Sequence, residues 1–211
     1  MTDEHPTARP FLPPRKTLAT LRRAAAICGG CDLHHLGTQT VFGEGPVPAH
    51  VMMVGEQPGD REDVEGHPFV GPAGHLLDQA LAEAGLDRDQ VYLTNAVKHF
   101  RFEMRGKRRI HRKPSMTQVS ACRPWLESEL SVVRPEILVL LGAVAAQSVM
   151  GSSFRVTQHR GEILDAPDLR PQVVPTVHPA SILRARDERA REEQRSAFVH
   201  DLTVVARAIA A

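Results

Sequence analysis

The sequence predicts an α/β fold, a three-layer α/β/α sandwich in which helices cover both faces of a central four-stranded parallel sheet. Short apolar runs of strand length alternate along the chain with segments that carry Leu and Ala at helical spacing, which is the pattern of such a sheet. A length of 211 residues, with 42% hydrophobic and 24% charged residues, suits one globular domain.

The N-terminal residues 1–15 are rich in Pro, and we expect them to form a flexible tail ahead of a single domain at 16–211. They contain no apolar region of the kind found in secretion signals. The longest apolar run, 137–141, is far shorter than the roughly 18 residues of a membrane span. We therefore expect neither secretion by that route nor a membrane partner.

The sequence pattern in the first half of the domain predicts two helices and two strands. Leu and Ala at helical spacing predict a helix at 16–27. The run HVMMV at 50–54 predicts a buried strand, and residues 91–94 predict a second one. Between them, residues 73–84 predict a helix with one apolar face, which Gly85 ends.

Two prolines affect the elements that the sequence predicts for the second half of the domain. Pro124 predicts a kink or a late start in a helix that begins near Ser115. Pro175 has no N–H for a sheet ladder, so it favours an edge position for the strand at 173–177. The other elements expected here are a strand at 137–141 and helices at 143–150 and 189–208.

Polar segments directly follow the four predicted strands. They are GEQPGD at 55–60, the segment 95–98, Gly142, and His178 with Pro179. Ligands of parallel sheets bind beyond the carboxyl ends of the strands, so these segments predict a site along one sheet edge. GEQPGD matches neither a Walker A loop nor GxGxxG, which argues against an ATP or NAD enzyme.

The net charge of +1 hides an uneven distribution. Residues 98–113 contain eight Lys or Arg and one Glu, a local balance of +7, which leaves about −6 for the rest of the chain. Such a concentration of cations indicates phosphate binding, and nucleic acid is the foremost candidate. The alternatives are a solvated loop and a contact for an acidic protein. Aromatic residues make up only 4%, which argues against a broad base-stacking surface.

The three cysteines indicate a metal site more than a disulfide framework. Cys28 and Cys31 form a CxxC pair, and Cys122 is the third. A site with four ligands needs one more residue, and the nearest histidines are His99 and His34. Zinc and an iron–sulfur cluster are both compatible with this composition.

Two further residues each allow two interpretations. The rigid turn at 66–74 would present Phe69 at the predicted sheet edge, although a single Phe is more often a core residue. His111 follows Lys107-Arg108-Arg109-Ile110, where nearby cations favour its neutral, nucleophilic form. The simpler interpretation is that His111 is another phosphate-binding residue.

Taken together, these motifs resemble the uracil-DNA glycosylase superfamily, and within it the iron–sulfur family 4. The matching segments are CxxC at 28–31, GEQPGDRED with GHPFVGPAGHLL, TNAVK at 94–98, ACRPWL at 121–126 and TVHPAS at 176–181. They occur in the family's order and span about residues 22–183. The resemblance implies the same three-layer fold and removal of uracil from DNA in base-excision repair.

Two departures refine this resemblance. Family 4 members carry a Cys directly after TNxVK, where this sequence has His99, so the resemblance implies a [4Fe–4S] cluster held by Cys28, Cys31, Cys122 and His99. The other departure is an inserted loop ending in KRRIH, which together with Gln57 in GEQPG is similar to the UdgX group. That group cleaves uracil from single-stranded DNA and stays covalently joined to the abasic sugar.

The resemblance also implies roles for individual residues in binding the base. Gln57, Phe69 and Asn95 would bind uracil flipped out of the DNA. Phe69 would stack on the base, and the Asn95 amide would pair with O4 and N3–H, a pattern that cytosine reverses. His178 would hydrogen-bond O2 and stabilise the departing uracilate.

The implied covalent step belongs to the inserted loop. His111 would attack C1′ of the oxocarbenium-like sugar, and Glu56 would stabilise that cation or accept the imidazole proton. Lys107, Arg108 and Arg109 would bind the DNA. We expect a monomer in the bacterial cytoplasm, associated with the nucleoid, with uracil-containing single-stranded DNA as its partner.

Two other functions are kept as alternatives. A conventional iron–sulfur uracil-DNA glycosylase would release a free abasic site, and the KRRIH loop is the feature that discriminates against it. A non-enzymatic single-strand-binding or redox protein would release no uracil and would require neither Glu56 nor His178.

Overall fold

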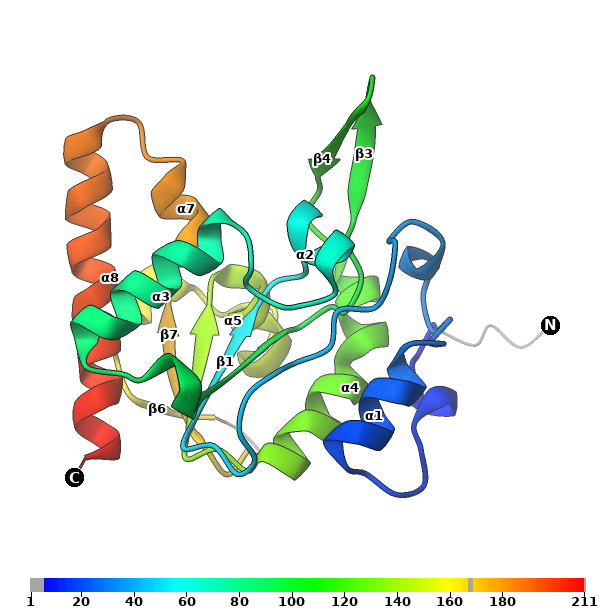
Figure 1. Ribbon diagram of the computed structural model, residues 1–211. Coiled ribbons are helices and arrows are strands. Elements are labelled where there is room, and N and C mark those ends of the chain that lie inside the picture. Colours follow the sequence, from blue (N-terminus) through cyan, green and yellow to red (C-terminus); the bar gives the residue numbers. More distant parts are fainter. Residues whose placement is uncertain (1–5, 167–168, 211) are drawn as a thin grey trace.

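The computed structural model describes residues 6–166 and 169–210, with one central sheet between two layers of helices (Figure 1). The strand order is β2-β1-β5-β7-β6, and only the β6–β7 pair is antiparallel. These strands are β1 (Val51–Gly55), β2 (Val91–Asn95), β5 (Ile137–Leu141), β6 (Leu164–Asp165) and β7 (Gln172–Thr176). The predicted α/β sandwich is confirmed, and β6 adds a fifth strand to the four expected ones.

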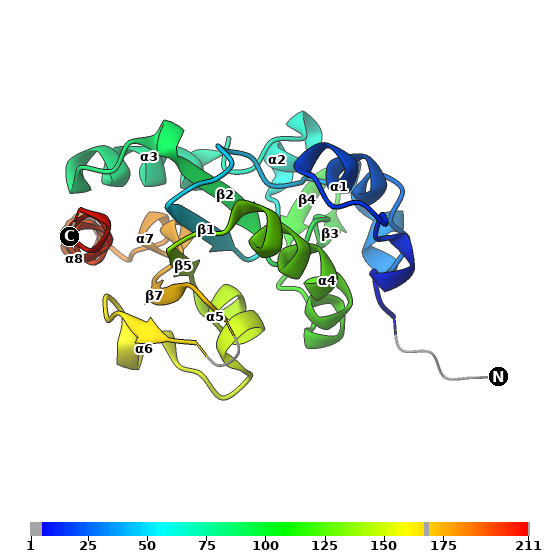
Figure 2. The same cartoon turned by 90° about the horizontal axis from the view of Figure 1, so that it is seen from below.

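The helices divide between the two faces of the sheet (Figure 2). One face carries α3 (Pro72–Ala84), α7 (Pro179–Leu183) and α8 (Glu188–Ile209), and the other carries α4 (Met116–Val133) and α5 (Ala143–Met150), with α1 (Leu18–Ala25) packed on α4. The shorter helices are α2 (Asp60–Glu65), α6 (Val156–His159) and 3-10 helices at Arg9–Phe11, Asp32–His35 and Arg88–Gln90. Among the described helices, none combines the length and apolar character needed to cross a membrane.

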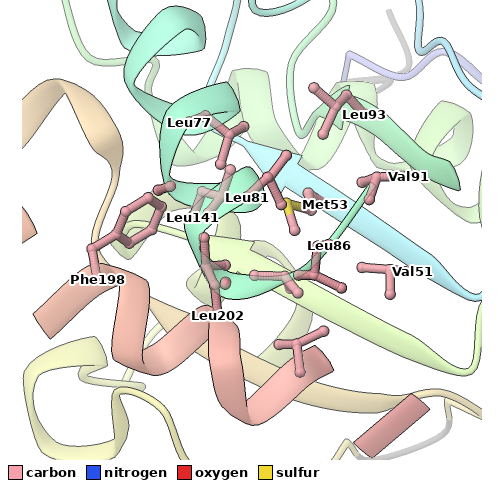
Figure 3. Close-up of a cluster of buried hydrophobic side chains, with 14 of the residues drawn as sticks. Val51, Met53, Leu77, Leu81, Leu86, Val91, Leu93, Leu141, Phe198 and Leu202 are labelled. Atoms are coloured by element: carbon pink, nitrogen blue, oxygen red, sulfur yellow. The ribbon is translucent and has the colours of Figure 1, made fainter. Parts of the chain in front are cut away.

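Each strand contributes side chains to two separate cores. In β1, Val51 and Met53 join the core under α3 and α8 (Figure 3), whereas Met52 and Val54 join the core under α4 and α5. Burying such a side chain stabilises the fold by roughly 1.5–3 kcal/mol. Burial on both faces explains why the strands are continuous apolar runs in the sequence.

Helix α4 begins where the sequence predicts but continues through its proline. Ser115 accepts a hydrogen bond from the Gln118 backbone N–H, and Gln118 Oε1 accepts one from the Ser115 N–H. Because the helix runs unbroken past Pro124, the predicted late start is wrong. The carbonyl that loses its helical partner belongs to Ser120, which is exposed and can bind water instead.

Strand β7 is not at the edge that Pro175 led us to expect, because β6 pairs beyond it. This pairing reaches only Gln172 and Val173, so it ends before the proline. The Pro175 carbonyl accepts a hydrogen bond from the Gly161 N–H. In a strand, the backbone N and O atoms of one residue point to the same neighbouring strand. The N–H that Pro175 lacks would therefore face the β6 side, at a point beyond the end of β6.

The basic segment forms a β-hairpin where the sequence led us to expect a loop. Strand β3 (Phe102–Arg105) pairs with β4 (Arg108–His111) in antiparallel register, with Phe102 opposite His111. The turn uses Gly106, whose φ of 58° suits glycine. The hairpin projects away from the sheet above its carboxyl edge (Figure 1), and its base brings His111 toward that edge.

Part of the segment that we expected to be a tail packs on the domain. Ala8 is buried, and its N–H donates to the Ala121 carbonyl of α4 over 2.8 Å. Gly30 allows this approach, since a Cβ there would collide with the backbone of Thr7 and Ala8. Residues 1–5 of the expected tail lie outside the described residues.

Candidate functional site

A cavity of about 580 Å³ opens at the carboxyl ends of β1, β2 and β7, under the base of the hairpin. All the residues proposed from sequence for catalysis or uracil binding line it, although they come from separate segments. These residues are Glu56, Gln57, Phe69, Asn95, His111 and His178. A volume of this size accepts a small planar molecule such as a nucleobase with part of its sugar.

The floor of the cavity depends on a glycine. A Cβ on Gly55 would collide with Oδ1 of Asn95 and with the Phe69 ring, so only glycine lets these two side chains approach. Phe69 has a positive φ of 59°, a strained conformation for a residue with a side chain. The Asn95 side chain makes no hydrogen bond to another residue in the described part of the chain, so its amide is available to a ligand.

His178 is held as a neutral imidazole of defined tautomer. Its Nδ1 accepts a hydrogen bond from the Ala180 N–H over 3.1 Å at the start of α7. Nδ1 therefore carries no proton, and the proton lies on Nε2. Burial, reinforced by Arg184 and His111, lowers the pKa of His178 to about 4. At neutral pH this side chain can donate one hydrogen bond into the cavity.

His111 and Glu56 meet at the cavity wall. Nε2 of His111 lies 3.5 Å from Oε1 of Glu56. Burial raises the pKa of Glu56, opposed by Lys113 and Arg184. The pKa of His111 is lowered, as its basic sequence neighbours suggested, but the causes are burial first and then Arg184. A neutral imidazole beside a carboxylate can act as a nucleophile or a base.

Gln57 connects His111 to the base of the hairpin. Its Nε2 contacts the carbonyls of Arg101 and Arg112 at 3.2 and 3.0 Å and lies 2.9 Å from Nε2 of His111. Its Oε1 accepts the Arg101 N–H, which fixes the amide orientation. The amide nitrogen can only donate, so this contact places the proton of His111 on Nδ1. We expected Gln57 to bind uracil, but its amide is engaged by the hairpin.

The cations of the hairpin are not equivalent. Lys107 and Arg108 are exposed near its tip. Arg109 instead binds Asp60 and Asp63 of α2, with N···O distances of 2.5 and 2.6 Å, and its side chain is only 20% exposed. We expected all three to bind DNA, but Arg109 serves to tie the hairpin to α2. Lys98 is also buried, so it is not part of a phosphate-binding surface.

The proposed metal ligands line a second, smaller cavity between α4, the CxxC segment and the end of the TNAVK segment. Cys28, Cys31, Cys122 and His99 all contribute to its wall. Within the described residues, no three His, Cys, Asp or Glu side chains are close enough together to hold a metal ion. His99 Nε2 lies 3.0 Å from Thr40 Oγ1.

The surroundings of these cysteines nevertheless suit an iron–sulfur cluster. The Trp125 indole N–H and the Lys98 backbone N–H point at the sulfurs of Cys28 and Cys122, each over 3.3 Å. N–H donors of this kind stabilise thiolates that ligate iron. Burial raises the pKa of Cys122 to about 12, so a thiolate there needs a cation. The chemistry of these side chains and of the N–H donors around them therefore suits an iron–sulfur cluster.

Sequence reasoning missed three residues around the main cavity. Arg184 follows α7, lines the cavity and lowers the pKa of both His111 and His178. Asp60 and Asp63 anchor the hairpin through Arg109. The acidic pair was visible in GEQPGDRED, but no sequence signal indicated which of the many arginines it would bind.

Known proteins share sequence similarity with most of this chain. Residues 42–203 match the profile described as the Uracil DNA glycosylase superfamily. The chain is 37% identical to the type-4 uracil-DNA glycosylase of Sulfurisphaera tokodaii, covering 79% of this chain and 76% of the relative. It is 36% identical to the type-4 uracil-DNA glycosylase of Thermotoga maritima, covering 78% of this chain and 82% of the relative. It is 33% identical to that of Archaeoglobus fulgidus, covering 87% of this chain and 90% of the relative. The chain therefore belongs to the uracil-DNA glycosylase superfamily.

Proposed function

We propose that this protein is a uracil-DNA glycosylase that acts on single-stranded DNA and remains covalently bound to the abasic sugar through His111. The observation that carries the proposal is the meeting of the His111 imidazole and the Glu56 carboxylate in the cavity that Asn95, Phe69 and His178 also line. The hairpin supplies His111, whereas the other residues come from the sheet edge and the turns that follow it.

Uracil recognition is assigned to Asn95 and Phe69. A base must leave the stack to enter the cavity, and this costs less from a single strand than from a duplex. The Asn95 amide can donate to O4 and accept from N3–H, while Phe69 stacks on the ring. Cytosine would leave both amide groups unpaired, at a cost of about 1–3 kcal/mol for each buried group.

Cleavage is assigned to His178. As the bond between C1′ and N1 breaks, both electrons stay with the base and uracilate forms. The His178 tautomer that donates from Nε2 can stabilise the charge that develops on O2. The sugar left behind resembles an oxocarbenium ion, and the Glu56 carboxylate can stabilise it.

Trapping is assigned to His111. Its Nε2 carries a lone pair in the tautomer that Gln57 selects. This lone pair attacks C1′, and the new C1′–N bond requires the Gln57 contact to be released. The imidazolium that results then loses its Nδ1 proton to solvent, which reaches the half-exposed side chain, and becomes a neutral substituted imidazole, which is a poor leaving group.

A [4Fe–4S] cluster held by Cys28, Cys31, Cys122 and His99 would stabilise the fold and would take no part in the reaction. Its ligands come from both ends of a long segment, so binding would tie the CxxC segment to α4 and to the end of β2.

The test is to mix the protein with uracil-containing single-stranded DNA and separate the products on a denaturing gel. We expect a protein–DNA band that resists heat and alkali, with one equivalent of uracil released. Uracil release with only alkali-labile abasic sites would identify a conventional glycosylase instead. No release of uracil would refute the proposed function altogether.

A further inference from the structure

We propose that the buried ion pair between Lys98 and Glu129 is a positioning device that fixes Asn95 for base recognition. Nζ of Lys98 lies 2.5 Å from Oε2 of Glu129, and the two side chains are 1% and 0% exposed. Neither residue lines the main cavity, so any effect on the base must pass through Asn95. The inference rests on the proposed function, because it concerns how uracil is selected.

The Lys98 ammonium group uses all three of its protons. Besides Glu129, it donates to Oγ1 of Thr94 over 2.6 Å and to the backbone carbonyl of Asn95 over 2.7 Å. The last bond closes the turn that follows β2. Together with the Ala96 N–H, which donates to the Gly55 carbonyl over 2.9 Å, it fixes both polar groups of the peptide bond that follows Asn95.

Glu129 is equally well satisfied. Its carboxylate accepts from the Gly43 N–H over 3.1 Å, from the Tyr92 hydroxyl over 3.0 Å and from the Thr94 hydroxyl over 2.9 Å. It thus joins α4 to two residues of β2 and to the segment at Gly43. Because these donors fix the carboxylate, the Lys98 ammonium group has one position in which it can bind it.

Stability alone does not explain a buried pair of this kind. Replacing such a pair with neutral side chains of similar volume is often neutral or stabilising, because desolvation offsets the attraction. What the pair supplies is a fixed geometry. The Asn95 amide has no partner of its own in the described part of the chain, so the backbone beneath it must set its direction. An error of about 1 Å at such a group can cost about 100-fold in rate.

The same lysine also connects the two cavities. Its backbone N–H points at the sulfur of Cys122, and its backbone carbonyl accepts the Val41 N–H over 2.8 Å. One residue therefore holds the recognition amide through its side chain and a proposed cluster ligand through its backbone. A side-chain substitution should disturb the first contact and leave the second in place.

The test compares the double variant Lys98→Met/Glu129→Gln with wild type under single-turnover conditions. Both charges disappear together, and the oxygen of the introduced amide would still accept from Gly43 and Tyr92. We expect the maximal rate of uracil release to fall about 10- to 100-fold. The protein concentration for half-maximal rate and the melting temperature should change little. The matched control, Arg123→Met/Glu127→Gln, removes an exposed pair from the same helix and should keep the wild-type rate.

A cycle with Asn95→Ala decides whether the pair acts through Asn95. If it does, removing the pair in the Asn95→Ala background should cost less than about 3-fold, since the group it positions is gone. Fully additive losses, or a wild-type rate in the double variant, would overturn the inference. If the double variant does not fold, Thr94→Val removes the hydroxyl that contacts both Lys98 and Glu129 with little change in volume, and an unchanged rate there would count equally against the inference. Absence of uracil release by the wild-type protein would instead refute the proposed function.

Discussion

Nε2 of His111 lies 3.5 Å from Oε1 of Glu56, although one residue is on the hairpin and the other directly follows β1. Glu56 is positioned by the sheet edge. His111 reaches the cavity only because β4 ends there. This division of the site between sheet and hairpin predicts that base removal and sugar trapping can be separated by mutation.

Replacing His111 with Gly should abolish the covalent adduct and preserve uracil release. Departure of the base depends on groups of the sheet edge, and the space left by the imidazole admits water to C1′. The readouts are a denaturing gel for the adduct and alkaline scission for abasic sites. His159→Gly, a partly buried histidine of α6 that does not line the cavity, is the control and should trap normally. A heat-resistant adduct formed by His111→Gly would show that another residue is the nucleophile.

The affinity for single-stranded DNA should fall steeply with salt, but not all eight cations at 98–113 should contribute. Each phosphate neutralised on a single strand adds about 0.7 to the slope of log K against log salt. Lys107→Gln/Arg108→Gln should therefore reduce the slope by about 1.4 in a titration from about 50 to 200 mM salt. Arg189→Gln, exposed on α8, should leave it unchanged. A slope unaffected by the hairpin substitutions would exclude its tip as the phosphate-binding surface.

The sheet and the location of the site could be predicted from the sequence because both follow from short-range patterns. Strands buried on both faces appear as runs such as ILVLL at 137–141, and parallel strands place the residues that follow them at one edge. Helix α3 has its apolar spacing and its terminal glycine in the sequence itself. The prediction therefore placed Glu56, Asn95 and His178 together correctly.

What could not be predicted depends on partners that are distant in the sequence. FEMR alternates apolar and polar residues over only four positions, and RRIH has a single apolar residue, so the pattern was too short to mark β3 and β4 as strands. The basic run looked uniform, yet Arg109 is paired with α2 and Lys98 with Glu129 of α4. Only the fold distinguishes these internal cations from the exposed Lys107 and Arg108.

Replacing Arg109 with Gln should slow trapping more than uracil release. Its guanidinium group holds the hairpin to Asp60 and Asp63 and packs over the Phe102 ring at 5.2 Å. Without it, His111 should be less well positioned, and we expect adduct formation to slow roughly 10-fold or more. Arg108→Gln, the exposed neighbour, should alter DNA affinity and leave the ratio of adduct to abasic site unchanged. Equal ratios for the two variants would rule out the anchoring role.

Replacing Cys28 with Ala should cause loss of iron and of solubility together. The proposed cluster ties the CxxC segment to α4, and the Trp125 indole N–H would lose its sulfur acceptor. Iron content, absorbance near 400 nm and melting temperature are the measurements. Ile27→Ala alters the neighbouring residue, which is 79% exposed, and should change none of them. A Cys28→Ala protein of full stability and full uracil release would contradict a structural role for the cluster.

The ratio of adduct to free abasic site should depend on pH through His111. Once the base has left, neutral imidazole and water compete for C1′, and protonated imidazole cannot attack. Burial and Arg184 lower the pKa of His111 below its ordinary value of 6.5, so it is neutral at pH 7. The ratio should therefore be constant at and above neutral pH and should fall as the pH drops through that lowered pKa.

In Arg184→Gln one cause of the lowering is removed, so the pKa of His111 should rise and the decline should begin at higher pH. Quenched single-turnover reactions between pH 8 and pH 5, analysed for adduct and for alkaline scission, would measure both curves. A shift of the decline to lower pH in Arg184→Gln would show that His111 does not control the outcome.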